Sequence, residues 1–217
     1  MCPPPDTSSV GQTRSDVRYT VPMATFARSR RPATVRDLDH LPEDVVGQIV
    51  DGELIVHPRP DHPHVYVATV LTWALFGPFG QGLGGPGGWV ILAEPKIQFA
   101  EQLLVPDLAG WRKERFVAPR KGPYNLSPDW VCEILSPSTA GFDRVTKLPI
   151  YSHAEVGHAW VIDPVARTLE VMRRYEESWL IAATYQNQDR VCAEPFEALE
   201  IDLSLLWVAE EESGSEK

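Results

Sequence analysis

Two acidic residues of the sequence lie inside apolar stretches, where a carboxylate is costly to desolvate. Asp107 occurs in LLVPDLAG and Glu133 occurs in DWVCEILS. If these stretches are strands that lie close together, their carboxylates form an oxygen-rich pair of the kind that holds Mg²⁺. A divalent ion there would polarise a phosphate and lower the pKa of a bound water. The pair therefore indicates phosphodiester hydrolysis.

Each carboxylate also has an ordinary explanation. Strand alternation places Glu133 on the same face as Val131 and Leu135, where it would form a structural ion pair or face water at a strand edge. Pro106 and Asp107 together are typical of a turn. Taken singly, neither residue identifies a metal site.

Lys147 is the candidate cation for this chemistry. If residues 139–155 form one helix, Asp143, Lys147 and Tyr151 share a face, because they follow one another at intervals of four. A lysine beside the carboxylates would orient the attacking water or offset charge in the transition state. The alternative is a surface Asp143–Lys147 pair, which would contribute only ~0.3–0.5 kcal/mol.

Pro149 interrupts that helical pattern, because an interior proline removes a backbone donor and clashes with the preceding turn. We expect residues 137–156 to be largely helical. The helix is either kinked at Pro149 or begins near Leu148, with Lys147 just before its first turn.

Two polar segments could contact a substrate. His62 and His64 lie in HPRPDHPH, which lacks the spacing of a zinc site, so we expect a helix start, with His64 facing the cleft as the further alternative. The segment after the Asp107 stretch carries five cations against Glu114: Arg112, Lys113, Arg115, Arg120 and Lys121. A loop there would clamp a phosphate backbone beside the metal or simply be solvated.

The elements that position these residues follow from local patterns. Thr34 and Asp37 predict a short capped helix, and Asp51-Gly52 predicts a hairpin turn between two apolar runs. Apolar residues at helical spacing predict a helix from Asp61, its N-cap, to about Phe79. The stretches WVILAE, KIQFA and LLVPDLAG predict neighbouring strands. Further strands are predicted at DWVCEILS and HAWVIDP, and a hairpin turn at residues 176–178.

Composition bounds the whole chain. Its 217 residues fit one domain, which we place at residues 33–207, between a disordered arm at 1–32 and an acidic disordered tail at 208–217. The net charge of −10 argues against broad nucleic-acid binding, so any such contact is local. Three scattered cysteines and the lack of an apolar run long enough for a bilayer predict a reduced, cytoplasmic protein.

The run from VPDLAG through WVCEILSPSTAGFDRVTKLPIYSHAEVGHAWVIDP resembles the signature of the Uma-two family of restriction-endonuclease-like proteins, within the PD-(D/E)xK nuclease superfamily. The resemblance covers about residues 34–207. It implies an α/β fold with a restriction-endonuclease-like mixed sheet core flanked by helices, and with N-terminal and C-terminal β-hairpins.

The resemblance also implies roles for individual residues. Asp107 and Glu133 would bind Mg²⁺ or Mn²⁺, Glu53 of DGELIV would be an additional ligand, and Lys147 would position the attacking water. Leu135 stands where the standard motif has its lysine, which in this family is thought to have moved to the position of Lys147. The residues expected to contact substrate are Arg112, Lys113, Arg115, His64 and Tyr151.

Three functions remain open. The first is a metal-dependent endonuclease that hydrolyses DNA, with a homodimer as one expected assembly because many nucleases of the superfamily act as dimers. The second is a catalytically silent nucleic-acid- or protein-binding module on the same fold, which the acidic body and Leu135 favour. The third is a carboxylate metalloenzyme that acts on small phosphoesters.

Overall fold

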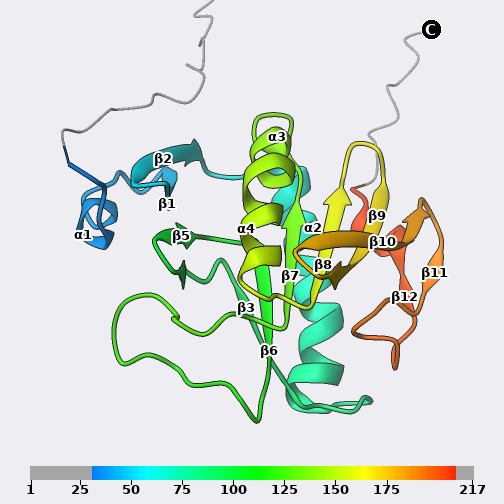
Figure 1. The fold of residues 1–217 in the computed structure, drawn as a ribbon. Coiled ribbons are helices and arrows are strands. Elements are labelled where there is room, and N and C mark those ends of the chain that lie inside the picture. Colours follow the sequence, from blue (N-terminus) through cyan, green and yellow to red (C-terminus); the bar gives the residue numbers. More distant parts are fainter. Residues whose placement is uncertain (1–30, 209–217) are drawn as a thin grey trace, which may run out of the picture.

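The structure is a computed structural model, and it describes residues 31–208 (Figure 1). The predicted arm at 1–32 and tail at 208–217 lie outside these residues, except for Arg31, Pro32 and Val208. None of the helices in the described part of the chain is long and apolar enough to cross a membrane.

A six-stranded mixed sheet forms the centre of the domain. Its order is β10-β9-β8-β7-β6-β3, and β7 and β8 form its parallel pair while the other neighbours are antiparallel. The strands are β3 (Trp89–Ala93), β6 (Leu108–Arg112), β7 (Trp130–Ile134), β8 (His158–Asp163), β9 (Thr168–Tyr175) and β10 (Ser178–Gln186). The predicted hairpin around residues 176–178 is confirmed as β9–β10.

A smaller antiparallel sheet of order β2-β1-β5-β4 stands beside the first. It contains β1 (Val45–Val50), β2 (Glu53–Pro58), β4 (Ile97–Phe99) and β5 (Gln102–Leu104). The predicted hairpin turn is confirmed: Asp51 and Gly52 both have positive φ, 52° and 76°, as a two-residue turn that follows the strand twist requires. Gln102 of β5 supports this turn by accepting a hydrogen bond from the Asp51 N–H at 2.7 Å.

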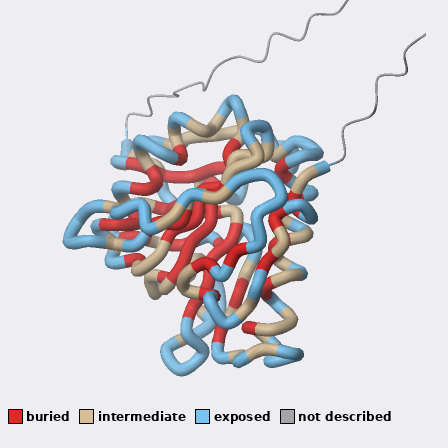
Figure 2. Tube along the Cα trace, turned by 90° about the vertical axis from the view of Figure 1, so that its right-hand side faces the viewer, coloured by how far each residue is buried: buried red, intermediate tan, exposed pale blue. Residues whose placement is uncertain are grey.

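Helices cover the two faces of the central sheet. The predicted helix from Asp61 is confirmed as α2 (His62–Leu75), which Asp61 caps and which continues as the π-helix η1 (Phe76–Gln81). Apolar residues of α2 pack on the face that includes Trp130 and Cys132, and the opposite face, with Val131 and Leu135, packs against the helix at 148–153. Figure 2 shows buried backbone running along the strands between these layers.

The remaining elements are short. The predicted capped helix at Thr34 is confirmed as α1 (Val35–Leu38), with the reciprocal bonds of a capping box. β11 (Arg190–Val191) pairs with β12 (Ile201–Asp202), and the 3₁₀-helix η3 (Leu203–Leu206) closes the described chain.

Two strand expectations need correction. WVILAE and KIQFA do not become neighbours, because β3 joins the large sheet and β4 the small one. LLVPDLAG is not one strand: β5 ends at Leu104, the chain crosses between the sheets, and β6 begins at Leu108. Asp107 therefore lies in the crossing segment, at the start of β6, where the Pro-Asp turn explanation also placed it.

The predicted helical region is three joined segments, α3 (Ala140–Phe142), the π-helix η2 (Asp143–Lys147) and α4 (Leu148–His153). The second expectation for Pro149 is confirmed, because α4 begins at Leu148, with Lys147 just before it. The backbone nevertheless remains helical through a wide turn in which the Leu148 N–H bonds to the Asp143 carbonyl. That turn keeps Asp143, Lys147 and Tyr151 on the buried side.

Candidate active site

Glu133 lies in the middle of β7 and is 1 % exposed. Its Oε2 accepts a hydrogen bond from Lys147 Nζ at 2.6 Å, and its Oε1 accepts one from the Tyr151 hydroxyl at 2.6 Å. Strand alternation turns this carboxylate toward α4, and the helix places its two donors one turn apart. This arrangement contains the structural ion pair considered for Glu133. It also confirms that Lys147 and Tyr151 share a helix face.

Lys147 is the charge centre of the site. Its ammonium lies 2.6 Å from Glu133 and 3.1 Å from Asp143 Oδ1, and all three side chains are buried. The alternative explanation, a surface pair of Asp143 and Lys147, is therefore wrong, because both residues face the interior. Burial lowers the pKa of Lys147, but Glu133, Asp143 and Asp107 outweigh that effect and raise it.

Burial has the opposite effect on the carboxyl of Glu133. It raises the pKa of that group to about 8, although the Lys147 ammonium works against the rise. The nearby negative charges of Asp143 and Asp107 add to the increase. Glu133 and Asp143 thus share one ammonium, and Asp107 is near enough for its charge to act on both the Glu133 and the Lys147 side chains.

Asp107 is held from two sides. Its Oδ2 accepts the Ile134 N–H at 2.7 Å, which brings the carboxylate across to β7 next to Glu133. Its Oδ1 lies 3.0 Å from His64 Nε2. Burial lowers the pKa of His64, yet the hydrogen bond and the charge of Asp107 produce a net rise.

The first turn of α2 positions His64. Asp61 caps the helix, and Pro63 occupies a position where a missing N–H costs nothing. His64 is 6 % exposed, and its Nδ1 has no hydrogen-bond partner within residues 31–208. His64 thus lies at the start of a helix, as expected, and it also faces the cleft, which was the further alternative.

A cavity of about 420 Å³ opens over this cluster. Asp107, Asp143, Lys147 and His64 all line it, whereas Glu133 lies behind Lys147 and is not among the lining residues. A hydroxyl-rich turn forms part of the wall, where Ser136 Oγ lies 3.1 Å from Ser138 Oγ and 2.9 Å from Thr139 Oγ1. The cavity is thus lined by groups that bind cations and by groups that bind phosphate oxygens.

Several residues that line this cavity were not among the site residues predicted from the sequence, and Gln48 and His57 are two of them. Gln48 of β1 is 4 % exposed, lines the cavity, and accepts the Val105 N–H at 2.9 Å through its Oε1. His57 of β2 also lines it, with its ring 4.9 Å from that of Phe142, and burial lowers its pKa. The signal for Gln48 was an amide inside the apolar strand VVGQIV.

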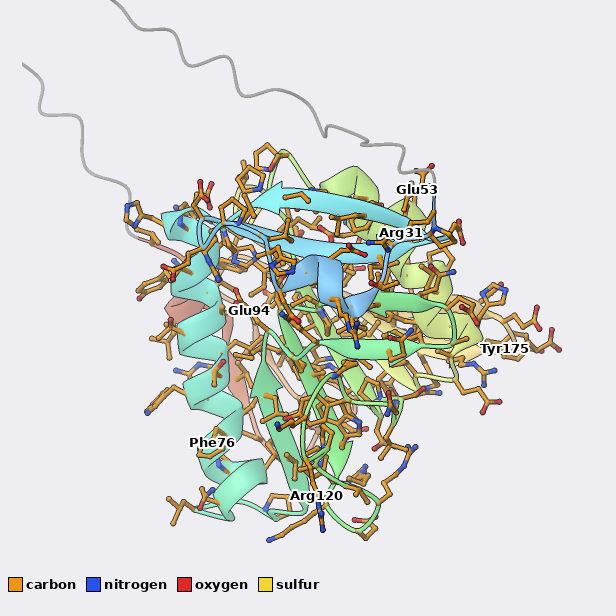
Figure 3. The ribbon with its side chains drawn as sticks, turned by 90° about the vertical axis from the view of Figure 1, so that its left-hand side faces the viewer. Arg31, Glu53, Phe76, Glu94, Arg120 and Tyr175 are labelled. Carbon is orange, nitrogen blue, oxygen red and sulfur yellow. The ribbon has the colours of Figure 1, made fainter. Side chains whose placement is uncertain are left out.

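The structure does not bring together every residue expected at the site. Glu53 is exposed at the start of β2 and does not line the cavity. The acidic residue Glu94 does line it, and Figure 3 labels both side chains. Arg112 ends β6 while Asp107 precedes its first residue, so the strand separates them by ~16 Å. The basic loop that follows Arg112 is therefore not beside the carboxylates, and Arg115 there pairs with Asp129 at 2.5 Å.

Comparison with known proteins gives the family. The sequence model described as "Uma2: Putative restriction endonuclease" matches residues 35–205. The chain belongs to the Uma2 family. This result confirms the resemblance seen in the sequence.

A solved structure supports the same fold. The Uma2 chain is similar to a protein described as "a putative nuclease belonging to DUF820 from Anabaena variabilis ATCC 29413", with a TM-score of 0.65 and 20 % sequence identity. The similarity covers 81 % of this chain and 98 % of that one. A comparison with curated proteins finds no match. The restriction-endonuclease-like α/β fold is confirmed.

Proposed function

We propose that this Uma2 protein is a metal-dependent endonuclease that hydrolyses DNA. The observation that carries the proposal is a buried cluster beside an open cavity, in which Glu133 and Asp143 bind the Lys147 ammonium and Asp107 is held against β7 by the Ile134 N–H. Family membership supports nuclease chemistry for that cavity, because the matching family is described as "Putative restriction endonuclease".

The residues fit a divalent cation that the substrate helps to hold. No group of three or more His, Cys, Asp or Glu side chains within residues 31–208 forms a ready-made metal site. Mg²⁺ characteristically uses one or two carboxylates and takes its other ligands from water and substrate phosphates. The carboxyl groups gathered around Lys147 suit such a cation, and we assign its binding to Asp107 and Glu133.

When bound, the cation supplies Lewis acidity toward the phosphate and a water of lowered pKa. The chain's own residues do the rest. Lys147 offsets charge that develops on the phosphate oxygens, which is the role expected of a preorganised cation in a dry site. Asp143 holds the Lys147 ammonium, Tyr151 orients the Glu133 carboxylate, and His64 orients Asp107. Glu53 has no part in this assignment, because its exposed side chain lies outside the cavity.

The direct test is cleavage of supercoiled plasmid and single-stranded DNA with Mg²⁺ or Mn²⁺. We expect Glu133→Gln and Asp107→Asn to lower the rate at least about a hundredfold, the usual loss when one preorganised electrostatic group is removed. Glu155→Gln is the matched control, because Glu155 is a carboxylate whose side chain is 80 % exposed outside the cavity. Equal activity in all three variants would contradict the assignment.

One observation favours the silent module instead. Both oxygens of Glu133 already accept hydrogen bonds, and Lys147 stands between this carboxylate and the cavity. A protein of this kind would bind DNA or a protein partner without hydrolysis. It becomes the better account if no DNA form is cleaved with either metal while the protein remains folded.

A further inference from the structure

A second hollow, of about 490 Å³, continues from the site along the outer side of α2. It shares four lining residues with the first cavity, which are Pro60, His64, Glu94 and Asp107. From that common edge it follows α2 to the start of η1. Any ligand that fills both hollows has one part at Asp107 and another part against the helix.

This groove along α2 is apolar and aromatic. Trp73 is 74 % exposed, Phe76 is 43 % exposed, and their spacing of three places both on one side of the helix. The hydroxyls of Thr69 and Thr72 donate to backbone carbonyls at 2.8 Å and 2.6 Å, so they are satisfied within the helix. The groove beyond the shared edge therefore offers flat apolar surface and no charged side chain.

The far end of the groove lies near the predicted basic loop. η1 packs on β3, and the loop begins beside the first residues of that strand, with the Arg112 guanidinium 4.1 Å from the centre of the Trp89 ring. The Lys113 N–H donates to the Gly88 carbonyl at 2.9 Å. Figure 3 shows Phe76 and Arg120 both at this end of the molecule, with Glu94 at the cavity end.

We propose that the groove along α2 binds unpaired nucleotides of DNA next to the phosphate that occupies the carboxylate site. Bases stack on Trp73 and Phe76, and the backbone beyond them reaches the cations of the basic loop. The substrate class is then single-stranded or locally unpaired DNA. This inference rests on the proposed nuclease function, and it gives the basic loop a role although ~16 Å of strand separates it from Asp107.

The continuity of the groove with the cavity favours nucleotides over a second copy of the chain. Aromatic side chains bind single strands through the faces of the bases, which every nucleotide offers once it is unpaired. In a duplex the same faces are covered by neighbouring base pairs. Because the two hollows share His64 and Asp107, an occupant of the groove adjoins the carboxylate site, as a strand bound for cleavage must.

Fluorescence anisotropy with a labelled thymidine oligonucleotide tests this inference, in EDTA so that no cleavage occurs. We expect Trp73→Ala to weaken binding about tenfold, which corresponds to loss of one stacked base. Trp73→Phe should keep most of the affinity, because it retains an aromatic face. Leu180→Ala is the matched control, since Leu180 is a 55 % exposed apolar residue on β10, at the opposite edge of the sheet.

Equal oligonucleotide affinity of wild type and Trp73→Ala would overturn the inference. A duplex of the same sequence that binds as tightly as the single strand would also overturn it. So would a wild-type dimer that Trp73→Ala dissociates without change in oligonucleotide affinity. The last result would assign the groove to a second copy. Failure of the nuclease proposal looks different, because the oligonucleotide would still bind through Trp73 while no DNA is cleaved with metal.

Discussion

Lys147 shows how a single residue organises the site. Its side chain is buried between Glu133 and Asp143, and no other Lys or Arg within residues 31–208 is buried. Truncation of one partner of a buried ion pair is far more costly than the pair's net contribution, because the remaining charge loses its compensation. The stability of the free protein should therefore depend strongly on this ammonium.

Lys147→Met should lower the free energy of unfolding by about 3–5 kcal/mol at pH 8. The cost should shrink at pH 5, because Glu133 then takes up a proton and is no longer an uncompensated charge. Urea denaturation at the two pH values measures both effects. Arg144→Met is the control, since Arg144 pairs with Glu170 at the surface and should cost at most about 1 kcal/mol. Equal costs for the two variants would contradict the buried-pair account.

The raised pKa of Glu133 predicts a pH dependence with a definite sign. The pKa of about 8 in the folded protein exceeds the ordinary glutamate value of 4.5, so the folded state binds more protons than the unfolded state between these pH values. The stabilisation from this group is complete below about pH 4.5 and is lost as the pH rises toward 8. Lys147 adds no slope there, because its pKa is raised from an already basic value.

The free energy of unfolding of wild type, measured relative to Glu133→Gln, should therefore fall as the pH increases from 5 to 8. The slope should reach at most about 1.4 kcal/mol per pH unit, the value for one proton. Thermal or urea unfolding of both proteins in the absence of divalent metal measures this difference. Parallel profiles would show that Glu133 ionises with an ordinary pKa.

At this scale the sequence predicted much of the site. Asp107, Glu133 and Lys147 were identified because carboxylates in apolar strands and a lysine at helical spacing are unusual. The contact of His64 with Asp107 did not follow from the sequence, since only the folded chain brings the two residues together. Glu53 was predicted as a ligand from the resemblance alone. It shares a sheet face with Gln48, because it pairs with Val50, but it lies at the turn end of the hairpin and does not line the cavity as Gln48 does.

At the scale of elements, glycines mark where strands approach their neighbours closely. A Cβ on Gly110 of β6 would lie 3.2 Å from atoms of both Trp130 and Trp89, two rigid rings on the same sheet face. Gly141 is different, because no atom lies within 4 Å of its Cβ position and its segment is helical. The two positions therefore predict opposite effects of the same substitution.

Gly110→Ala should destabilise the protein by about 1–3 kcal/mol, the usual cost of overpacking a core. Gly141→Ala should be neutral or stabilise by up to about 1 kcal/mol, because alanine favours helix and restricts the unfolded chain. Denaturant midpoints of both variants give the comparison. A destabilised Gly141→Ala together with an unaffected Gly110→Ala would contradict the packing described for β6.

Elements with strong local signals were predicted correctly, and those that depend on distant partners were not. Asp61, the Asp51-Gly52 turn and the α4 start near Pro149 all follow from neighbours in the chain. The wide turn of η2 was missed because Pro149 allows either a kink or a new helix start. Pro149 has no backbone N–H, and the local sequence does not specify how the hydrogen bonds of the preceding turn rearrange around it.

At the scale of the whole molecule, the site exists because the chain changes sheets. β5 belongs to the small sheet and β6 to the large one, and Asp107 lies in the crossing between them. Pairing between segments far apart in the sequence decides which sheet each strand joins. Local sequence patterns therefore predicted the strands but not the sheets to which they belong. The same fact explains why the basic loop, which begins five residues beyond Asp107 in the sequence, lies at the opposite end of β6.

Calorimetric titration of Mn²⁺ into the wild-type protein and Glu133→Gln, each with a short DNA oligonucleotide present, tests the central claim most directly. Two carboxylates alone do not complete the coordination of the metal, and the oligonucleotide supplies the missing phosphate oxygens. The account predicts saturable binding to wild type that is lost in the variant. Absence of binding to a well-folded wild type, or identical binding to both proteins, would contradict the assignment of a divalent cation to Asp107 and Glu133.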